Sequence, residues 1–440
     1  MKKYFWIDAA IATMFIFLLM GGIYKLTQLR LFDAFDSIGQ ALADVELTDY
    51  VFSQLREDPP LDTNIVVINF GELSRRQVAE QIRIISQHKP KVIGIDGFYN
   101  CQGLPRDTVF CPPLKDSIGN LMLSYAIKEA GNVVLVSKLL KSLELSRQDV
   151  EDVYDSLEQS DPLFREVMFA EGYASLETDA AYQDDVKTCR TFNPKMEVNG
   201  VNHLAFAVQM AMLYDSVKTK KFLARDNFSE VINYRGNIAD FFGQTKYPQV
   251  FYTLDVEDVF TENFLPSMIE GKVVIFGFLG KEFGDPSWSD KFFTPLNLKM
   301  AGKANPDMFG VVVHANIVSM ILNEDYVNTM KDWQEWVLAI VLCYLNVALF
   351  SLIYIKLPDW YDGITKLIQV AELILFTLIM VEVFDLFSYK FDTTLSLAAI
   401  ALVGDSYEIY MGVIKNSINR LKNSRLFTKG RSKVLNSDNQ

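Results

Sequence analysis

The chain has 440 residues, of which 50% are hydrophobic and 22% are charged, with a net charge of −13. This length accommodates one large domain together with membrane segments. The negative charge excludes nucleic acid as a main partner, because phosphate binding requires a basic surface. The hydrophobic excess lies in residues 9–24 and after Trp333, and the residues between them have the mixed charge of globular sequence.

Residues 1–27 are predicted to form a cytoplasmic N-terminus and a membrane anchor. Lys2 and Lys3 precede an apolar run from Ala9 to about Tyr24. A removed signal peptide is the alternative, but no small-x-small cleavage site follows the run. With its flanking aromatic residues the segment reaches about 20 residues, which is enough to cross roughly 30 Å of hydrocarbon.

Residues 28–332 are predicted to fold as an α/β domain. Continuous apolar runs indicate buried strands, and 3.6-residue periodicity indicates helices between them. The expected strands are residues 65–68, 92–95, 132–139 and 273–276, and the expected helices are residues 73–86, about 121–127 and about 311–322. Residues 146–228 are expected to be more helical and irregular. The pattern predicts a sheet with helices on its faces.

Three further apolar stretches are predicted to cross the membrane within residues 333–414. They cover about 336–355, 364–387 and 395–414. A buried helical hairpin in a soluble protein is the alternative. Aromatic residues near the proposed ends favour membrane helices, because Trp and Tyr gather at the membrane–water interfaces.

The predicted orientation follows from the basic tail, residues 415–440. This tail contains seven Lys and Arg residues between Lys415 and Lys433 against one acid, Asp438, so it should remain in the cytoplasm. Four spans then place the N-terminus in the cytoplasm and residues 28–332 outside it. We therefore expect a multi-pass protein of the bacterial inner membrane with its large domain in the periplasm.

Two acids are expected deep in the membrane, Glu372 and Asp405. Charges at this depth are costly and usually face a partner or the interior of a helix bundle. We expect these two side chains to bond between helices or to contact another subunit. Glu382, Asp385 and Glu408 are expected near the interfaces, where water solvates them.

Four cysteines are present. Cys101 and Cys111 bracket a Gly/Pro-containing loop after the second expected strand, a spacing that suits a disulfide in an oxidising compartment. Cys189 is the rival partner for either of them. Cys343 lies in a predicted span, where it is expected to be a small packing residue.

Three aspartates follow expected strands: Asp96, Asp285 and Asp290. Ligands bind beyond the carboxyl ends of strands in open α/β sheets, so these residues are ligand candidates. Helix capping and turn formation are the alternative roles, and the favoured ones. His314 lies in an apolar helix and is more readily explained as a core or capping residue than as a catalytic one.

No catalytic arrangement is recognisable in the sequence. The three histidines, His88, His203 and His314, lie in different segments without zinc-protease spacing. The GFLGK segment at Gly277 lacks the spacing of a phosphate-binding loop, and no nucleophile-elbow motif occurs. We expect no enzymatic activity, no cofactor and no metal.

The motifs and their order resemble those of the CHASE2 family of extracytoplasmic sensory domains. The segments that carry the resemblance are VVINFGELSRRQVAEQI, IGIDGFY, IEGKVVIFG, DKFFTP (residues 290–295) and GVVVHAN (residues 310–316). With the four spans they cover nearly the whole chain. The resemblance adds Asn69, Thr294 and His314 to Asp96, Asp285 and Asp290 as ligand or signal-binding candidates. Asn69 stands where the family pattern has Asp, so a charged role is not expected there.

The resemblance implies a sensory function. Family members typically carry a kinase or cyclase after the last span, whereas 26 residues follow Ile414 here, so we expect a stand-alone member that signals to a separate polypeptide. Two alternatives remain open: a structural subunit of a cell-envelope complex, and a membrane-anchored periplasmic enzyme of unrecognised type. The expected partners are the membrane, other membrane or envelope subunits, a separate kinase or cyclase, and a second copy of the chain.

Overall fold

The computed structural model divides the chain into two compact units, residues 41–327 and residues 1–40 with 328–440. We call the first the outer domain and the second the membrane unit, and each is described by itself. The structure describes residues 5–27, 46–57, 59–101, 111, 115–147, 152–176, 188–238, 249–285, 288–298 and 305–417. Cys111, which forms a disulfide bond, is thus described although the residues on either side of it are not.

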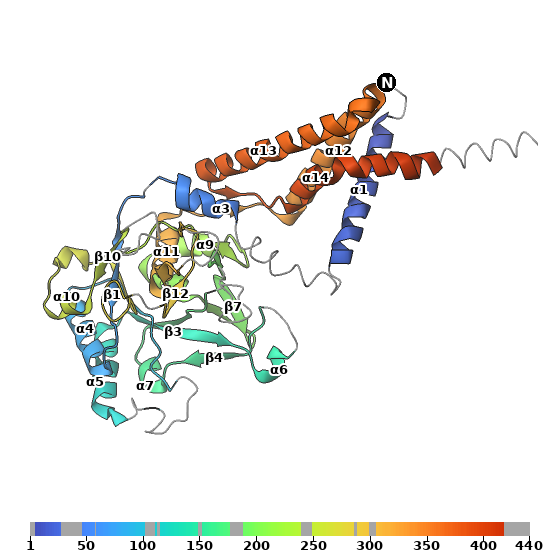
Figure 1. Ribbon diagram of the computed structural model, residues 1–440. Helices are drawn as coiled ribbons and strands as arrows, with labels where there is room; N and C mark the ends of the chain where they lie inside the picture. Colours follow the sequence, from blue (N-terminus) through green and yellow to red (C-terminus); the bar gives the residue numbers. More distant parts are fainter. Residues whose placement is uncertain are drawn as a thin grey trace, which may run out of the picture. The chain divides into compact units, whose positions relative to one another are not determined.

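The outer domain is built around a seven-stranded sheet (Figure 1). Its order is β10-β1-β11-β2-β3-β4, and β5 also pairs with β3. All pairs are parallel except β3 with β4. The strands are β1 Asp62–Asn69, β2 Val92–Ile95, β3 Val133–Leu140, β4 Ser156–Gln159, β5 Ala170–Tyr173, β10 Phe251–Leu254 and β11 Val273–Gly277. The predicted α/β fold is therefore confirmed.

The central strands are continuous apolar runs because both faces of the sheet are covered. Every residue of β2 and β11 is buried, as are Ile65 to Asn69 of β1. Parallel sheets hide both faces under crossover helices, so no polar alternation is needed. These three strands contain the segments that the sequence predicted, and β11 lies between β1 and β2.

Helices cover the two faces of the sheet. On one face, α4 (Arg75–Gln87), α5 (Ser117–Ala130) and α10 (Val256–Phe260) enclose a core with alternate strand residues such as Val66 and Ile68. On the other, α8 (Phe206–Tyr214) and α11 (Gly310–Asn323) pack on the sheet. Glycines permit the close approach of these two helices. A Cβ at Gly277 would lie 2.4 Å from Val311, and one at Gly94 would lie 2.1 Å from the sulfur of Met210.

In the part of residues 146–228 that the structure describes, the expected helices are present as α7 (Pro162–Arg165), α8 and α9 (Ser216–Leu223), but five strands lie there that were not predicted. This region contains β4 and β5 of the main sheet, β6 (Thr191–Phe192), and a hairpin of β7 (Lys195–Val198) and β8 (Val201–Leu204). Asn199 and Gly200 join the hairpin with positive φ angles of 51° and 80°. This is the geometry of a type I′ turn, and Asn-Gly is its strongest sequence signal.

Short elements complete the outer domain. They are α3 Leu47–Tyr50, η2 Val51–Leu55, α6 Leu143–Ser146, α7 Pro162–Arg165, α9 Ser216–Leu223, β9 Glu230–Val231, η4 Pro266–Met268, β12 Lys291–Phe292 and β13 Met308–Phe309. The antiparallel pair β12–β13 leads directly into α11. This pair therefore fixes the residues around position 290 beside the first turn of α11.

Among its described residues, the membrane unit contains four helices that are long and apolar enough to cross a membrane, as predicted. They are α1 Phe5–Thr27, α12 Asp332–Lys356, α13 Tyr361–Phe387 and α14 Thr394–Ile409, which η6 (Tyr410–Lys415) continues. A short 3₁₀ turn, η5 (Pro358–Trp360), separates α12 from α13, and β14 (Asn328–Thr329) pairs with β15 (Tyr389–Lys390). Small and apolar side chains of α1, α12 and α14 form the core of this unit.

Candidate functional site

The carboxyl edge of the outer-domain sheet gathers several candidate residues. Parallel strands end at the same edge, so Asn69 at the end of β1, Asp96 after β2 and the loop after β11 emerge side by side. Ligands bind at this edge in open α/β sheets. The six predicted ligand-binding candidates nevertheless make different contacts in the structure.

The Asn69 side chain has a structural role, because it holds neighbouring segments together by hydrogen bonds. Its buried side chain donates hydrogen bonds from Nδ2 to Asp255 Oδ1 (2.8 Å) and to the Gly280 carbonyl (3.1 Å). Its Oδ1 accepts bonds from the backbone N–H groups of Gly71 (2.9 Å) and Leu279 (3.0 Å). The amide thus needs both its donor and its acceptor atoms here. An ionised Asp at this position would place a second carboxylate against Asp255.

Asp285 shapes the loop that follows β11. Its Oδ2 accepts the backbone N–H of Lys281 at 3.0 Å, and its carbonyl accepts a bond from Lys291 Nζ at 2.8 Å. The same ammonium group lies 4.7 Å from the centre of the Phe309 ring. These contacts support the turn-forming alternative for Asp285.

The charges of Asp96 and Asp290 influence each other, and we call these two residues the carboxylate pair. The Asp96 side chain is partly buried, and burial together with the smaller effect of the negative charge of Asp290 raises its pKa to about 8. Asp290 is an exposed residue, and the partial desolvation of its carboxyl raises its pKa less, to about 6. Because solvent screens Asp290, we expect Asp96 to hold the proton longer.

The backbone fixes Asp290 beside α11. Its carbonyl accepts the N–H of Gly310 at 2.9 Å, and a Cβ at Gly310 would lie 3.3 Å from Asp290 Oδ1. Asp290 adopts a left-handed conformation, with φ of 58°, which is uncommon outside glycine. Asp290 is therefore fixed beside the first turn of α11, from where its charge acts on Asp96 after β2. A change in its protonation would act on both elements.

Thr294 makes a separate, buried contact with Asp307. Its hydroxyl donates to Asp307 Oδ2 at 2.5 Å, and its backbone N–H donates to Oδ1 at 2.9 Å. Asn297 Nδ2 adds a third bond to Oδ1 at 3.1 Å. Burial raises the pKa of Asp307 to about 7 against the opposing effect of these bonds. Thr294 thus braces the segment before α11.

His314 lies in the core between α11 and its neighbours. Its ring meets Phe206 edge to face, with centroids 5.3 Å apart, and hydrogen-bonds the backbone of Ala174. Burial lowers its pKa to about 4, so the ring is neutral at physiological pH. This is the core role that the sequence favoured, although the buried Nδ1 finds no hydrogen-bond partner among the described residues.

Comparison with protein families identifies this architecture. The model of the CHASE2 domain matches residues 10–353, more than three quarters of the chain. The chain belongs to the CHASE2 family. No curated protein and no solved structure matches it. CHASE2 is a sensory domain, and with four apolar helices this chain is a membrane-anchored sensory protein.

Two site residues of this CHASE2 domain were missed in the sequence. Asp255 follows β10 at the same edge, caps α10, and holds Asn69. Its position after an apolar strand was the signal that could have revealed it. Asp307 had no comparable signal, because only the β12–β13 pair brings it to Thr294. Within the described residues, no group of three or more His, Cys, Asp or Glu side chains is placed to hold a metal ion.

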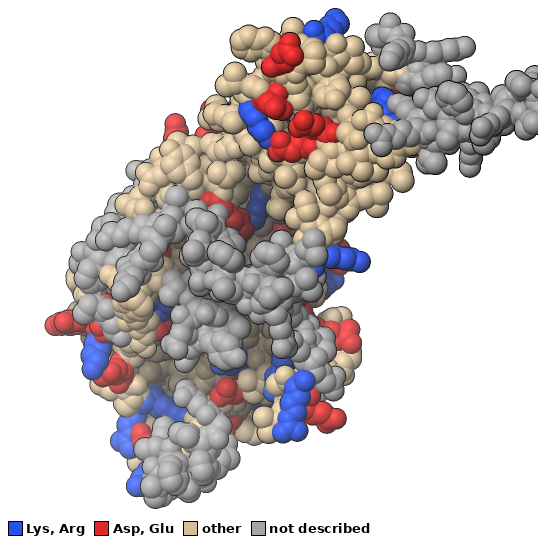
Figure 2. All heavy atoms as spheres, turned by 45° about the vertical axis from the view of Figure 1, so that its right-hand side comes forward, with Lys and Arg blue, Asp and Glu red and all other residues tan. Residues whose placement is uncertain are grey.

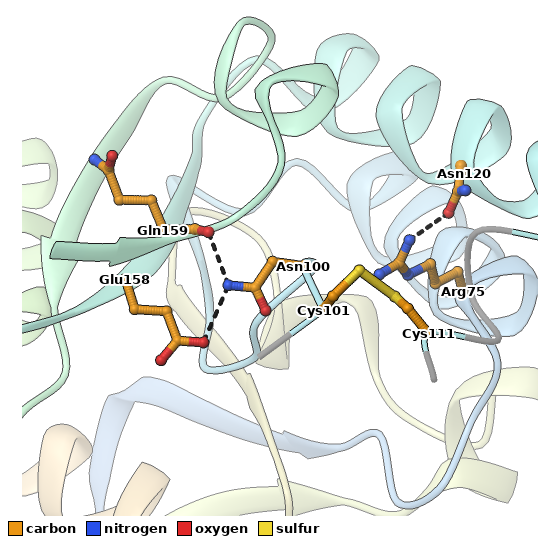
Figure 3. The surroundings of a disulfide bond; sticks show 7 residues. All are labelled: Arg75, Asn100, Cys101, Cys111, Asn120, Glu158 and Gln159. Atoms are coloured by element: carbon orange, nitrogen blue, oxygen red, sulfur yellow. Dashed lines mark hydrogen bonds between the residues drawn. A yellow bond between two sulfur atoms is a disulfide. The ribbon is translucent and has the colours of Figure 1, made fainter. Parts of the chain in front are cut away.

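The disulfide of the CHASE2 domain joins Cys101 and Cys111 beside this edge, with Cα atoms 5.4 Å apart (Figure 3). Asn100 anchors the start of the loop to β4, through Glu158 Oε1 at 3.1 Å and the Gln159 carbonyl at 2.9 Å. Both sulfur-bearing residues are buried. Cys189 lies elsewhere in the core, where its carbonyl accepts the Tyr234 hydroxyl.

Replacing both bridged cysteines by serine should lower the free energy of unfolding by about 2–3 kcal/mol, because the unfolded chain regains loop entropy. Thermal unfolding of the full chain in detergent measures the change. A reductant should destabilise the wild type by a similar amount and leave the double variant unchanged. Alkylatable thiols at both Cys101 and Cys111 in freshly isolated protein would contradict the bridge.

The intramembrane acids have partners within the chain. Asp405 is not an unpaired carboxylate, because Lys366 Nζ of α13 donates to both of its oxygens at 2.6 Å. Asp8 of α1 likewise accepts bonds from Lys415 and from the Tyr410 hydroxyl. Asn346 of α12 hydrogen-bonds Glu372, whose Oε2 is buried without a hydrogen-bond partner among the described residues. Contact of Glu372 or Asp405 with another subunit remains a prediction.

Proposed function

We propose that this CHASE2 protein binds a signal at the carboxyl edge of its outer sheet and relays it through its membrane helices to a separate polypeptide. The family match over residues 10–353 carries the proposal. The Asp96–Asp290 pair is the proposed sensing point. In this proposal the pair transmits the signal from the end of β2 to the first turn of α11, and it is supported by the raised pKa values of both carboxyls.

Binding, rather than turnover, is the proposed activity of the outer domain. The acidic and basic side chains of the described surface are interspersed in Figure 2, so the net charge of −13 does not form one continuous acidic field on that face. A signal would then be recognised by local groups, of which the carboxylate pair is the most perturbed. Protonation, or a cationic group of a ligand, would relieve the repulsion between the two carboxylates.

The proposed location is the bacterial inner membrane, with the outer domain in the periplasm and both termini in the cytoplasm. Support comes from the even number of candidate spans and from Lys and Arg at both ends of the sequence. The proposed output contact is the membrane unit, where charged and polar side chains join the helices. Gln369 of α13, for example, donates to the carbonyls of Ile400 and Ala401 of α14 at 2.8 Å.

Co-purification tests the relay. Tagged wild type, Asp96→Asn and Glu282→Gln are isolated in mild detergent, and the associated membrane proteins are quantified by mass spectrometry. Glu282 is an exposed acid of the loop after β11 and serves as the matched control. We expect Asp96→Asn to change the amount of bound partner by about fivefold or more, the range of allosteric coupling, and Glu282→Gln to leave it unchanged.

A second pair of variants locates the output contact. Asp405→Leu alone would leave Lys366 unpaired, so the neutral test is Lys366→Leu with Asp405→Leu. This double change should weaken partner recovery while preserving membrane insertion. Identical partner recovery in wild type, Asp96→Asn and the double variant would reject the relay. Loss with the double variant alone would instead favour a structural subunit.

A further inference from the structure

The chain enters and leaves the outer domain through two short segments that meet on one buried residue. The entry segment is residues 46–56, which follow α1 in the sequence, and the exit segment is residues 324–327, which follow α11 and precede α12. Asn233 is 1% exposed and contacts both. Its Oδ1 accepts a hydrogen bond from Arg56 Nη1 at 2.5 Å, and its Nδ2 donates to the Asp325 carbonyl at 3.0 Å. The Asn233 amide therefore joins the two ends of the outer domain.

Further contacts seat the entry segment on the outer domain. Asp49 is buried, and its carboxylate accepts hydrogen bonds from the Arg190 guanidinium at 2.9 and 2.6 Å. The Phe52 ring meets the Tyr234 ring edge to face, with centroids 6.5 Å apart. A bidentate ion pair fixes geometry as well as adding energy. The entry segment is therefore packed on the same region that carries Asn233.

The exit segment is held by the neighbours of Asn233. Arg235 Nη1 donates to the Asp325 carboxylate at 3.4 Å, and Arg225 Nη2 donates to the Val327 carbonyl at 3.2 Å. The backbone N–H of Asn233 contacts the sulfur of Met320, near the end of α11, at 3.4 Å. The exit segment thus has several bonds to the region around residue 233.

Helix α11 connects this region to the carboxylate pair. Gly310, the first residue of the helix, donates its N–H to the Asp290 carbonyl at the carboxyl edge of the sheet. Near the other end of the helix, Ser319 and Asn323 bond the carboxylate of Asp62, the first residue of β1. The helix therefore runs from one edge of the sheet to the other, a length of about 20 Å for its 14 residues.

Asn316 ties the middle of α11 to the segment that carries Asn233. Its buried Oδ1 accepts the backbone N–H groups of Arg235 (2.8 Å) and Gly236 (3.2 Å), and its Nδ2 donates to the Gly236 carbonyl at 2.9 Å. Three bonds from one side chain fix residues 233–236 against the helix. A displacement of α11 at its Asp290 end would therefore carry Asn233 with it.

We infer that Asn233 is the positioning residue through which α11 acts on both segments that lead to the membrane helices. We call Asn233, Arg56 and Asp325 the joint. A shift of α11 moves Asn233, which moves the entry and the exit segment together rather than independently. The inference rests on the relay proposed above for the origin of the shift, whereas the contacts of the joint belong to the fold itself.

Hydrogen–deuterium exchange of the full chain in mild detergent tests the joint. Asn233→Leu removes both hydrogen bonds, so amide exchange should become about fivefold faster in the entry and the exit segment, the effect of one lost bond in each. Asn233→Asp keeps the acceptor for Arg56 and loses the donor to Asp325, so exchange should rise in the exit segment alone. Asn202→Leu, at an exposed asparagine of β8, is the matched control and should change neither.

Two perturbations at the other end of α11 test transmission. Asp96→Asn removes the charge that the proposed signal would neutralise. Gly310→Ala acts independently of any signal, because its Cβ would lie 3.1 Å from the Phe292 ring and 3.3 Å from Asp290 Oδ1. Each should change exchange in the entry segment by about fivefold, within the range of allosteric coupling. In the Asn233→Leu background, neither should change it.

Arg56→Leu provides a second test at a residue that is only partly buried. It removes the entry side of the joint, so Gly310→Ala should then affect the exit segment and no longer the entry segment. Thermal unfolding checks that every variant is folded. Should Asn233→Leu not fold, Asn233→Asp and Arg56→Leu interrupt the two sides of the joint separately.

The outcomes separate the joint from the proposed sensing. An entry segment that responds to Gly310→Ala but not to Asp96→Asn supports the joint and contradicts the carboxylate pair as the sensing point. An entry segment that responds to neither variant overturns the inference. A response that persists in both the Asn233→Leu and the Arg56→Leu backgrounds also overturns it, because the displacement would then travel by another route.

Discussion

Asp96→Asn is expected to stabilise the protein at neutral and alkaline pH. An ordinary Asp has a pKa near 3.8, and the pKa of Asp96 in the fold is about 8. Between these values the folded chain holds a proton that the unfolded chain has lost. The stabilising effect of this proton is complete below about pH 4 and disappears as the pH rises through 8. Asparagine mimics the protonated side chain and keeps this stability.

The gain should grow from near zero at pH 4 to about 2 kcal/mol at pH 8, a value reduced for the partial solvent contact of Asp96. Thermal unfolding of the full chain in detergent, at intervals from pH 4 to pH 8.5, measures it. Glu282→Gln is the control and should follow the wild type at every pH. Parallel curves for wild type and Asp96→Asn would show that Asp96 ionises as an exposed aspartate does.

A reporter assay of the chain's orientation in the membrane should give an all-or-none result. A phosphatase reporter that folds only in an oxidising compartment should be active when inserted after Gly200, and inactive when fused after Gln440. Gly200 is a suitable site because it lies in the exposed β7–β8 turn. The physical reason is the basic sequence at both ends, which resists translocation.

A complementary reporter that is active only in the cytoplasm should give the opposite pattern at the two positions. Equal expression of the fusions is checked by immunoblotting. Phosphatase activity at Gln440 would require an odd number of spans and would overturn the orientation. Activity at neither position would place residue 200 in the cytoplasm.

The strands that were predicted from the sequence share one physical feature, a continuous apolar run. β1, β2, β11 and the first half of β3 are short apolar runs, and such runs are read correctly because both sheet faces are buried. The β7–β8 hairpin was missed although Asn199–Gly200 marked it, because the polar residues around it suggested an irregular segment. Its strands are only partly buried and lack a continuous apolar run, so the turn is their one clear signal.

The candidate site was only partly predictable. Strand ends indicated Asp96 and Asp290, and both lie at the same edge, but their mutual effect depends on the β12–β13 pair that fixes position 290. No local pattern indicates that long-range pairing. In the membrane unit, Asp405 was considered alone although Lys366 lay within a predicted span. A search for opposite charges across spans would have found this pair.

The parallel pairing of β1 has a consequence for biogenesis. Its two neighbours, β10 and β11, are supplied by residues 251–254 and 273–277, so both edges of β1 remain open until most of the outer domain has been synthesised. Such non-local pairing is slow, and an open apolar strand is prone to aggregate. In the proposed orientation, a nascent chain tethered by its first helix would expose β1 throughout this interval of export. Folding helpers on the outer side of the membrane should therefore act on this strand, and export-stalled chains that end before residue 273 should be degraded rapidly.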